Sequence, residues 1–374
     1  MKKILFLFDV STDIVGGAQE SMKLIINNLS DRYDFYLISP LSQQINSNHI
    51  VLNGFEHFIL RKLKTRKVIR LIREILKQIK AINPDIIHVQ MPSTMIIISL
   101  MKLLKLLPKQ IKVLYTDRGV LDKYGKLTRF FIRRSGRRNL FDKIICTTNY
   151  NKQLYLKNNI VKNNKITVIS NTAGEHFEKY SDYNRKKVRE SRNIPSGTVV
   201  FGFAGRNSID KNWDLALNIT REIDKIYSDY RINLAIGTNG TNENYNDTID
   251  LINKFEEIVG KKNVIASIDL SLKEMEFFYY LNDIFILTSK KESFGRTAIE
   301  AMALMNVVFG TKVDGLKEVV HFNEYLYQDH IEFSIKLKSL KNIDDEKEKF
   351  YKRYSQNYSL GRYINNHIKL YSSR

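Results

Sequence analysis

Short apolar runs alternate with helix-like patterns along both halves of the chain. Each run is rich in Ile, Val, Leu and Phe and has the length of a buried strand. Repeated strand–helix units specify parallel sheets covered by helices. The pattern therefore predicts an α/β protein with two Rossmann-like domains. The predicted strands are "KKILFLF", "DFYLISP", "PDIIHVQ", "IKVLYT", "DKIICTT" and "KITVIS" in the first half, and "VVFGFAG", "RINLAIG", "NVIASI", "DIFILTS" and "NVVFGT" in the second.

A polar and charged stretch from Thr172 to Ser196 separates the strand "VIS" from the strand "VVFGFAG" and marks the domain boundary. The chain has 374 residues, more than one hydrophobic core usually organises, so two domains are expected. We expect an N-terminal domain over residues 1–175 and a C-terminal domain over residues 176–355. A helix over about residues 356–374 is expected to pack back on the first domain.

Two apolar stretches are too short to be targeting or membrane segments. The first ends at Asp9 after about five residues, fewer than the roughly seven of a signal-peptide core. The second, from Met95 to Leu107, is broken by two lysines, whereas a spanning helix needs roughly 18 unbroken apolar residues. Cys146 is the only cysteine, which fits a reducing cytosol. We expect no transmembrane helix and, from the spacing of the His residues, no metal site.

The charge of the chain is concentrated in its first half. Residues 1–200 hold 36 Lys and Arg against 15 Asp and Glu, whereas residues 201–374 hold 24 against 25. The two halves therefore carry net charges of +21 and −1. Such a basic half indicates an anionic neighbour: a membrane face, nucleic acid or an acidic acceptor.

An amphipathic helix is predicted between Arg61 and Lys80, because apolar side chains recur there at helical period. Each cation near an anionic leaflet contributes about 1 kcal/mol, so the polar face of this helix is expected to face a membrane. A solvated helix face is the alternative for any single basic run. The apolar face has Val68, Ile72, Ile75, Ile79 and Ile82; the basic ridge has Arg66, Arg70, Arg73, Lys77 and Lys80, reinforced by Arg129, Arg133, Arg134, Arg137 and Arg138.

The segment "KKESFGRTAIEAMA" is the strongest candidate for chemistry. It follows the strand "DIFILTS", so Glu292 stands at a carboxyl end of the sheet, where open α/β sheets bind ligands. Small residues at Ser293 and Gly295 let backbone amides approach a ligand, and the helix N-terminus that follows favours a pyrophosphate. Beside such an anion, Glu292 and Glu300 fit as acceptors from sugar or ribose hydroxyls. On spacing alone, ordinary carboxylates at a helix start fit equally well.

This segment resembles the signature of the family 4 retaining glycosyltransferases, in which two Glu residues flank seven others in the context "EGFGLVLLEAMA". Here Glu292, "SFGRTAI" and Glu300 are followed by "AMA". Three other segments resemble the family's "VGR…KG…LL", "VIPNG…F" and "VVATDVGGIPEVV": "FGFAGRNSIDKNWDLAL", "VISNTAGEHF" and "VVFGTKVDGLKEVV". The resemblance runs from "DVSTDIVGGAQESMKLI" to about Val320. It implies a GT-B fold, with two parallel sheets facing across a cleft.

The resemblance implies that the donor, a nucleoside-diphosphate sugar, binds mainly to the second half. Arg206 and Lys211 follow the strand end "GFAGR" and would hold the pyrophosphate, although a basic pair in a loop is more often solvated surface. A cation at about 4 Å is worth on the order of 4 kcal/mol at an effective dielectric near 20, so two cations can replace a metal. We expect Arg206, Lys211 and Glu292 to be catalytic. The expected donor contacts are Gly17, Arg206, Lys211, Glu292, Ser293, Phe294, Gly295, Arg296 and Glu300.

In the first half, Gly16 and Gly17 are similar to the family's "GGAE" turn, with Gln19 in place of the usual Glu. The resemblance implies that this loop closes over the diphosphate, with Gly17 as the contact, although paired glycines also serve tight turns alone. In "YTDRG", Arg118 takes the position of a His found in many family members. Two interpretations of Arg118 and the preceding Asp117 are open: an acceptor or oxyanion loop, or a pair that fixes the loop. His88 and His176 are expected to be structural.

The resemblance thus implies a metal-independent, retaining glycosyltransferase without a cofactor, which uses a nucleotide sugar, UDP being the family's commonest carrier. We expect a glycan or polyprenyl-diphosphate-linked acceptor in bacterial surface-polysaccharide assembly, at the cytoplasmic face of the membrane. No side chain has the role of a nucleophile, which agrees with a departing phosphate that takes the acceptor's proton. Two alternatives are a transferase acting on nucleic acid and a non-catalytic sugar-nucleotide or glycan-binding protein. The first lacks an aromatic-and-basic binding segment, and four donor-site residues present together disfavour the second.

Overall fold

The computed structural model describes residues 1–13, 17–178, 180–238 and 242–373. The chain divides into two compact units, which are described separately. Unit 1 contains Met1–Ser170 and Tyr363–Arg374, and unit 2 contains Asn171–Arg362. The sequence pattern alone sets these boundaries at residues 175 and 355.

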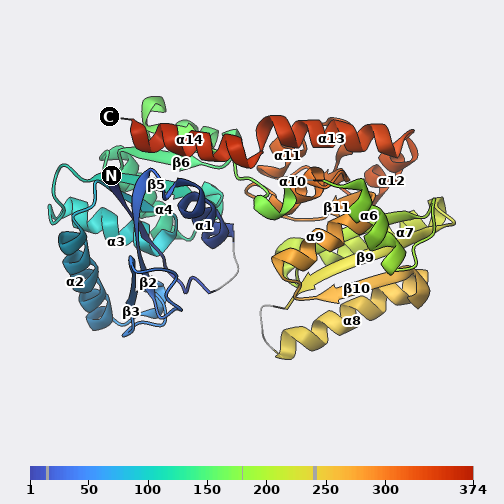
Figure 1. Cartoon of the computed structure of the whole chain (residues 1–374), viewed down its shortest axis with the longest axis horizontal. Helices are drawn as coiled ribbons and strands as arrows, with labels where there is room; N and C mark the ends of the chain where they lie inside the picture. Colours follow the sequence, from blue (N-terminus) through green and yellow to red (C-terminus); the bar gives the residue numbers. More distant parts are fainter. Residues whose placement is uncertain (14–16, 179, 239–241, 374) are drawn as a thin grey trace. The chain divides into compact units, whose positions relative to one another are not determined.

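Unit 1 is built on a parallel sheet with the strand order β3-β2-β1-β4-β5-β6-β7 within the described residues (Figure 1). The interior strand β1 pairs with β2 on one side and β4 on the other, so that Ile4 lies between Phe35 and Ile86. This place in the sheet explains why β1 is apolar and buried from Ile4 to Leu7. The strands are β1 (Lys2–Leu7), β2 (Tyr33–Pro40), β3 (His49–Leu52), β4 (Ile86–Val89), β5 (Lys112–Asp117), β6 (Lys143–Cys146) and β7 (Ile166–Val168).

The helices of unit 1 connect these strands, and a last helix returns from the C-terminal end of the chain. This last helix, α14 (Leu360–Ser372), belongs to unit 1 from Tyr363 onward. The Tyr363 hydroxyl donates to the carbonyl oxygen of Ser21 at 3.3 Å, and Lys2 Nζ donates to the carbonyl oxygen of Tyr371 at 3.0 Å. The other helices are α1 (Gly17–Leu29), α2 (Thr65–Ile82), α3 (Pro92–Leu103), α4 (Lys126–Arg137) and α5 (Asn149–Lys157).

Two buried histidines lie where α14 packs on the sheet of unit 1. His88 on β4 is hydrogen-bonded through Nδ1 to the Tyr371 hydroxyl at 2.9 Å and through Nε2 to Thr116 Oγ1 at 2.7 Å. Its ring centroid lies 6.4 Å from that of His367. Burial lowers the pKa of both rings, that of His367 to about 4, and the nearby Arg118 cation adds to the effect. His88 is therefore part of the interior, whereas His176 is exposed.

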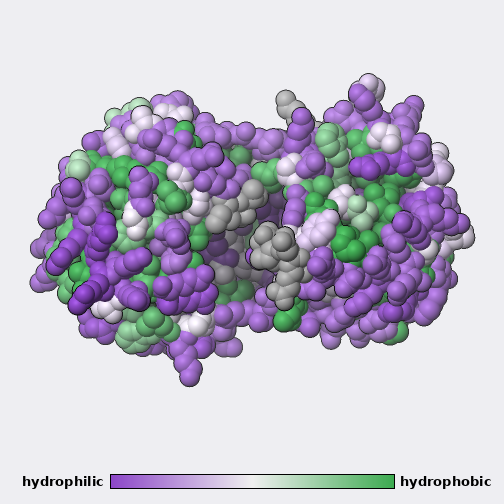
Figure 2. Space-filling model, turned by 90° about the horizontal axis from the view of Figure 1, so that it is seen from below, coloured by the Kyte–Doolittle hydropathy of each residue, from purple (hydrophilic) through white to green (hydrophobic). Residues whose placement is uncertain are grey.

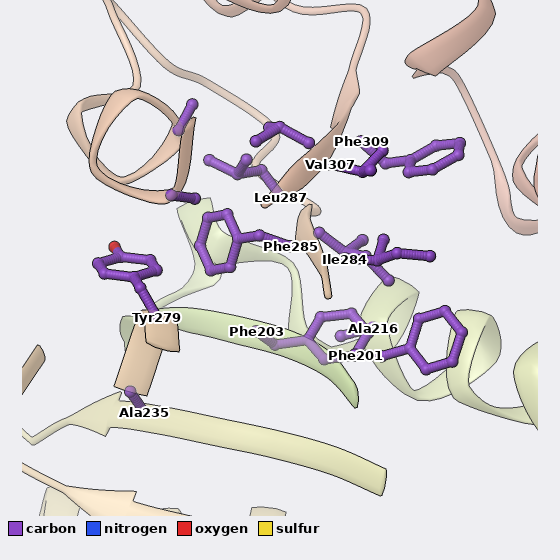
Figure 3. Packing of buried hydrophobic residues seen from close by; sticks show 14 of the residues in the cluster. Phe201, Phe203, Ala216, Ala235, Tyr279, Ile284, Phe285, Leu287, Val307 and Phe309 are labelled. Carbon is purple, nitrogen blue, oxygen red and sulfur yellow. The ribbon is translucent and has the colours of Figure 1, made fainter. Parts of the chain in front are cut away.

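Unit 2 is built on a second parallel sheet, with the order β10-β9-β8-β11-β12-β13 within its described residues. Its core is rich in aromatic residues. Figure 3 shows the rings of Phe201, Phe203 and Phe285 among the aliphatic side chains of Ile284 and Val307. The strands are β8 (Val199–Arg206), β9 (Tyr230–Gly237), β10 (Val264–Ile268), β11 (Ile284–Leu287), β12 (Val307–Thr311) and β13 (Leu326–Tyr327); the helices are α6 (Asp182–Ser191), α7 (Trp213–Ile226), α8 (Asn242–Val259), α9 (Leu272–Leu281), α10 (Arg296–Ala303), α11 (Leu316–Val320), α12 (His330–Lys338) and α13 (Ile343–Asn357).

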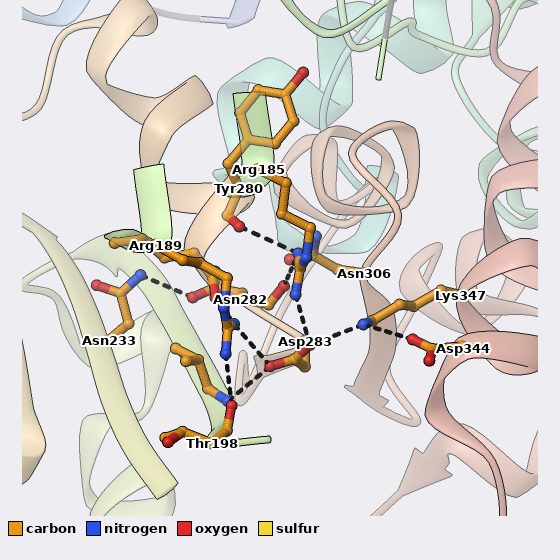
Figure 4. Close-up of polar contacts among 12 residues, drawn as sticks. Arg185, Arg189, Thr198, Asn233, Tyr280, Asn282, Asp283, Asn306, Asp344 and Lys347 are labelled. Carbon is orange, nitrogen blue, oxygen red and sulfur yellow. Dashed lines mark hydrogen bonds and ion pairs between the residues drawn. The ribbon is translucent and has the colours of Figure 1, made fainter. Parts of the chain in front are cut away.

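Asp283, just before β11, joins the first and last parts of unit 2 (Figure 4). One carboxylate oxygen lies 2.5 Å from Arg185 of α6 and 2.8 Å from Lys347 of α13; the other lies 3.1 Å from Arg189 of α6. Burial would raise the pKa of Asp283, but Arg185, Lys347 and Arg189 outweigh it and lower that pKa. Removing one partner of such a buried cluster typically costs about 3–5 kcal/mol, so this carboxylate holds α6 and α13 firmly on the sheet.

A second carboxylate joins the two ends of unit 2. Glu178 Oε1 accepts from the Tyr354 hydroxyl at 2.6 Å and from the backbone amide of Leu360 at 2.7 Å. The segment that enters unit 2 is therefore hydrogen-bonded to the segment that leaves it.

The two Rossmann-like sheets confirm the fold class predicted from the sequence. Every predicted strand is present, but β3 and β13 were not predicted. Each is short, with four and two residues, and β3 follows a polar stretch that gives no strand signal. In α2 the predicted Ile75, Ile79 and Ile82 are buried, Leu71 joins them, and Val68 and Ile72 are half-buried.

The outer surface of each unit is mainly hydrophilic. Figure 2 shows hydrophilic residues over most of the visible face of both units, with apolar residues gathered in smaller areas. In the part of the chain that the structure describes, no helix is long and apolar enough to cross a membrane.

Candidate functional site

The candidate donor residues of unit 2 are brought together by two neighbouring strands. β8 and β11 pair directly, with Ile284 beside Phe201, so the loops at their carboxyl ends meet. Arg206 ends β8, and Lys211 lies five residues later in a short 3-10 turn. Glu292 lies in the loop that follows β11. Strand pairing therefore explains why residues far apart in the sequence lie in one place.

The central contact of this site is an ion pair between Lys211 and Glu292. Lys211 Nζ lies 2.9 Å from Glu292 Oε2, and both side chains are about one-fifth exposed. The aliphatic part of Lys211 lies over Gly205, where an added Cβ would stand 3.1 Å from Lys211 Cδ. A side chain at position 205 would displace Lys211, so the "GFAGR" glycine keeps the lysine in position.

Backbone hydrogen bonds fix the loops that hold this ion pair. Thr288 Oγ1 donates to the carbonyl oxygen of Lys211 at 2.7 Å, which joins the two strand ends. The amide of Glu292 donates to Asp314 Oδ2 at 3.2 Å, and the amide of Gly315 donates to the carbonyl oxygen of Glu292 at 3.0 Å. Three successive loops of the sheet thus converge on Glu292.

Glu300 lies on the second turn of α10, and only 6% of it is exposed. Its Oε2 accepts from the Tyr279 hydroxyl at 3.0 Å, and its Oε1 lies 3.1 Å from Arg296 Nε. Arg296 also donates to the carbonyl oxygen of Ala173 at 3.2 Å. Burial and the Glu300 charge raise the pKa of Tyr279 well above its usual value, so its hydroxyl stays a donor. Glu300 is therefore an oriented, buried carboxylate and not an exposed one.

The turn between these two carboxylates is built on Gly295. This residue has φ +88°, and a Cβ there would lie 2.7 Å from Leu316 Cδ1, so only glycine fits. Ser293 is half-buried at the start of the turn. The ring of Phe294 is 3% exposed and packs in the core, 5.7 Å from the Tyr358 ring. A donor contact at Phe294 would therefore involve its backbone and not its ring.

Arg206 differs from Lys211 in having an exposed side chain. Its carbonyl oxygen accepts from Trp213 Nε1 at 3.1 Å, which fixes the backbone, while its guanidinium forms no ion pair with any described residue. A cation in this state is available to an anionic ligand. Lys211, by contrast, must leave Glu292 or share it.

In unit 1, Asp117 is fully buried at the end of β5 and fixes the loop that follows. It accepts from Tyr124 at 2.5 Å, from Asn151 and Tyr155 at 2.8 Å each, and from the Gly119 amide at 3.0 Å. Burial raises its pKa even though these hydrogen bonds lower it. This supports the loop-fixing interpretation for Asp117.

Arg118 points elsewhere: its Nε and Nη2 donate to Gln90 Oε1 at 2.9 and 2.6 Å. The predicted glycine contact lies at the start of α1. Gly17 begins this helix, is exposed, and has open space where a Cβ would be. Gly16 lies outside the described residues.

On α2 the predicted cations Arg66, Arg70, Arg73, Lys77 and Lys80 are all exposed.

Sequence reasoning singled out Glu292 and Glu300 but not the residues that hydrogen-bond to them. Tyr279 and Asp314 come from other elements, and neither belongs to a recognisable motif. Among the described residues, no three His, Cys, Asp or Glu side chains lie close enough together to hold a metal ion.

Two family models match the chain, one for each half. The family described as Glycosyltransferase Family 4 matches residues 15–173, and the family described as Glycosyl transferases group 1 matches residues 184–358.

Two curated relatives illustrate the similarity. An uncharacterized 41.2 kDa protein in the cps region of Klebsiella pneumoniae is 27% identical over 308 residues, 79% of this chain and 79% of that protein. The capsular polysaccharide biosynthesis glycosyltransferase CapM of Staphylococcus aureus is 27% identical over 181 residues, 47% of this chain and 45% of CapM.

Among solved structures, HepE from Anabaena in complex with UDP and glucose matches with a TM-score of 0.78. The match covers 100% of both chains at 16% sequence identity, which shows a common fold.

Proposed function

We propose that this chain, a glycosyltransferase of the GT-B fold whose halves match the models for Glycosyltransferase Family 4 and Glycosyl transferases group 1, moves a sugar from a nucleoside-diphosphate sugar to a glycan acceptor. The observation that carries the proposal is the Lys211–Glu292 ion pair at the adjoining ends of β8 and β11, together with the exposed Arg206 at the end of β8. Two cations and an oriented carboxylate suit a ligand with a diphosphate and hydroxyl groups.

The cations act on the leaving group. Arg206 and Lys211 hold the diphosphate, whose charge grows as the glycosidic bond breaks, so their attraction is strongest in the transition state. The N-terminal turn of α10, opened by Gly295, offers backbone amides to the same anion. We propose that these groups act without a metal ion.

The carboxylates act on hydroxyl groups. Glu300, oriented by Tyr279 and Arg296, accepts from the ribose, and Glu292 accepts from the sugar once Lys211 turns to the diphosphate. We propose that the configuration at the sugar carbon is retained, with the departing phosphate taking the proton of the attacking acceptor hydroxyl. UDP is the proposed carrier; HepE, which has the same fold, was solved with UDP and glucose.

The proposed acceptor is a glycan, free or linked to a polyprenyl diphosphate, in cell-surface polysaccharide assembly. The capsular role printed for CapM supports this pathway class. The net charge of +21 over residues 1–200 and the exposed cations of α2 support attachment to an anionic membrane surface. We propose that the enzyme works at the cytoplasmic face of the cell membrane.

A donor screen tests the proposal. Purified protein is incubated with a panel of nucleotide sugars and membrane extract, and release of the nucleoside diphosphate is measured with and without EDTA. We expect release from one donor, dependent on the extract and insensitive to EDTA. Lys211→Ala serves as the inactive control and Lys290→Ala, from the same loop region, as the matched active one. Donor binding without any release would favour the non-catalytic alternative.

A further inference from the structure

Helix α4 carries an unusual concentration of positive charge. Its twelve residues, "KLTRFFIRRSGR", include five cations and no acidic residue, and Arg138 follows at its C-terminal cap. These side chains surround a surface pocket of about 510 Å³. The pocket is lined by Lys126, Arg129, Phe130, Arg133, Arg134, Arg137 and Arg138.

The charges on α4 are not neutralised by the protein. In the described part of the chain, none of the six cations forms an ion pair, and Arg137 Nε donates to the carbonyl oxygen of Asn159 at 3.4 Å. Arg133 lies one helical turn from both Arg129 and Arg137, a spacing at which like charges destabilise a helix. An anionic ligand on this face would remove that repulsion.

Exposed apolar side chains lie among these cations. Phe130 is 54% exposed and Leu127 is 59% exposed. Phe130 lies edge-on to Phe131, with 5.5 Å between the ring centroids, and Phe131 packs against the core of unit 1. Leu104, at the end of the neighbouring helix α3, is 67% exposed (Figure 1). Cations alone would suit any phosphate, but cations around exposed Phe and Leu suit a phosphate attached to an apolar layer.

The other basic helix of unit 1 lacks this combination. α2 has Glu74 among its cations, and its Arg70 guanidinium lies 5.7 Å from the centre of the Phe55 ring. Ile69, 46% exposed, is the large apolar residue that α2 exposes within the described structure. α2 therefore offers charge without an apolar surface of comparable size.

We propose that α4 is the element through which unit 1 binds an anionic lipid surface, with its arginines on headgroup phosphates and Phe130 in the acyl boundary. α2 adds long-range attraction but does not enter the lipid. Lipid binding by α4 is inferred from the helix itself. Its role, which is to bring the enzyme to a lipid-linked acceptor, rests on the proposed function.

Two variants of equal charge test which helix carries the binding. Arg133, Arg134 and Arg137 are changed to Gln in α4, and Arg70, Arg73 and Lys77 to Gln in α2. Binding to phosphatidylglycerol–phosphatidylcholine vesicles is measured by flotation at several salt concentrations. At the usual contribution per cation, the α4 variant should bind about 100-fold more weakly. The vesicle affinity of the α2 variant should fall by less than tenfold. Equal losses would show diffuse attraction and overturn the assignment to α4.

Insertion is tested with a matched pair of tryptophan probes, Phe130→Trp in α4 and Ile69→Trp in α2. The native chain has one tryptophan, Trp213, buried in unit 2, which gives a constant background. Lipids brominated on their acyl chains should quench the probe at position 130 and leave the probe at position 69 unchanged. Absence of quenching at position 130 would contradict insertion.

Two further measurements distinguish a lipid surface from a free anion and from nucleic acid as the ligand of α4, and a third separates lipid binding from the transfer activity. Inorganic pyrophosphate at constant ionic strength should not displace the protein from vesicles; displacement would indicate a site for a free anion. Preference for duplex DNA over anionic vesicles at matched salt would overturn the lipid assignment in favour of nucleic acid. Transfer to a short soluble acceptor should be the same in the α4 variant and the native enzyme. Its absence in both would count against the proposed function and not against lipid binding.

Discussion

Lys211 Nζ and Glu292 Oε2, which lie 2.9 Å apart, join the loops that follow the neighbouring strands β8 and β11. The opposite charges of this pair cancel each other. In the proposed function, an arriving diphosphate competes with Glu292 for Lys211, whereas Arg206 is already available. Binding and turnover should therefore respond differently to the loss of each of these three side chains.

Glu292→Gln should separate the two effects most clearly. It frees Lys211, so the affinity for the nucleoside diphosphate should rise several-fold. Transfer should fall by roughly ten- to a hundredfold, because loss of a charged hydrogen bond to the sugar costs about 1.5–3 kcal/mol. Calorimetry with UDP and steady-state rates measure both. Unchanged affinity together with an unchanged rate would remove Glu292 from the site.

Arg206→Ala and Lys211→Ala should each lower kcat more than they weaken donor binding, since the charge that they face is greatest as the diphosphate departs. Each substitution should cost about 2–4 kcal/mol of transition-state stabilisation. The fall in kcat is measured at saturating donor, and the fall in donor affinity is measured by separate binding titrations. An active double variant, or complete inhibition of the native enzyme by EDTA, would contradict the role of these cations.

Glu300→Ala should weaken donor binding by roughly 1.5–3 kcal/mol, because a buried charged acceptor is lost. Tyr279→Phe keeps the carboxylate but removes a 3.0 Å hydrogen bond that orients it, so it should cost only about 0.5–1.5 kcal/mol. Calorimetry on both folded variants tests this order. A larger effect from Tyr279→Phe than from Glu300→Ala would place the ribose elsewhere.

The stability of unit 1 should fall on acidification. The pKa of His367 is lowered from about 6.5 in the unfolded chain to about 4 in the folded one, so between these values the unfolded state binds more protons. The contribution of His367 to the free energy of unfolding is fully present above pH 6.5. About 3 kcal/mol of that free energy is lost as the pH falls towards 4. His88 acts in the same direction, since its pKa is also lowered.

Thermal unfolding at pH 7.5, 6.5 and 5.5 measures this dependence, with His367→Gln as the comparison. At neutral pH the variant should unfold at a lower temperature than the native protein. Between pH 6.5 and 5.5 its unfolding temperature should change less, because it has no imidazole at position 367 to protonate. An equally steep decline in both proteins would assign the acid sensitivity to other groups.

How far the sequence predicted the site depended on whether the signal was local. Glu292, Gly295 and Glu300 lie in one loop and helix start, so their spacing could be recognised in the sequence. The parallel arrangement of neighbouring strands could also be predicted, because repeated strand–helix units form parallel sheets. The contacts made by Tyr279 and Asp314 join segments 21 and 22 residues away, and the bond between Asp117 and Tyr155 spans 38. Such pairings depend on packing, which no single segment encodes.

The two ends of unit 2 are joined through Glu178, and unit 1 is completed only by residues that follow unit 2 in the chain. This arrangement has a consequence for synthesis on the ribosome. Unit 2 has all its residues once position 362 has emerged, whereas unit 1 still lacks the helix that covers Tyr33 and His88. Although nascent domains generally fold in N-terminal to C-terminal order, the first unit of this chain should reach its native state last. Until then, unit 1 is incomplete, whereas unit 2 can already be folded.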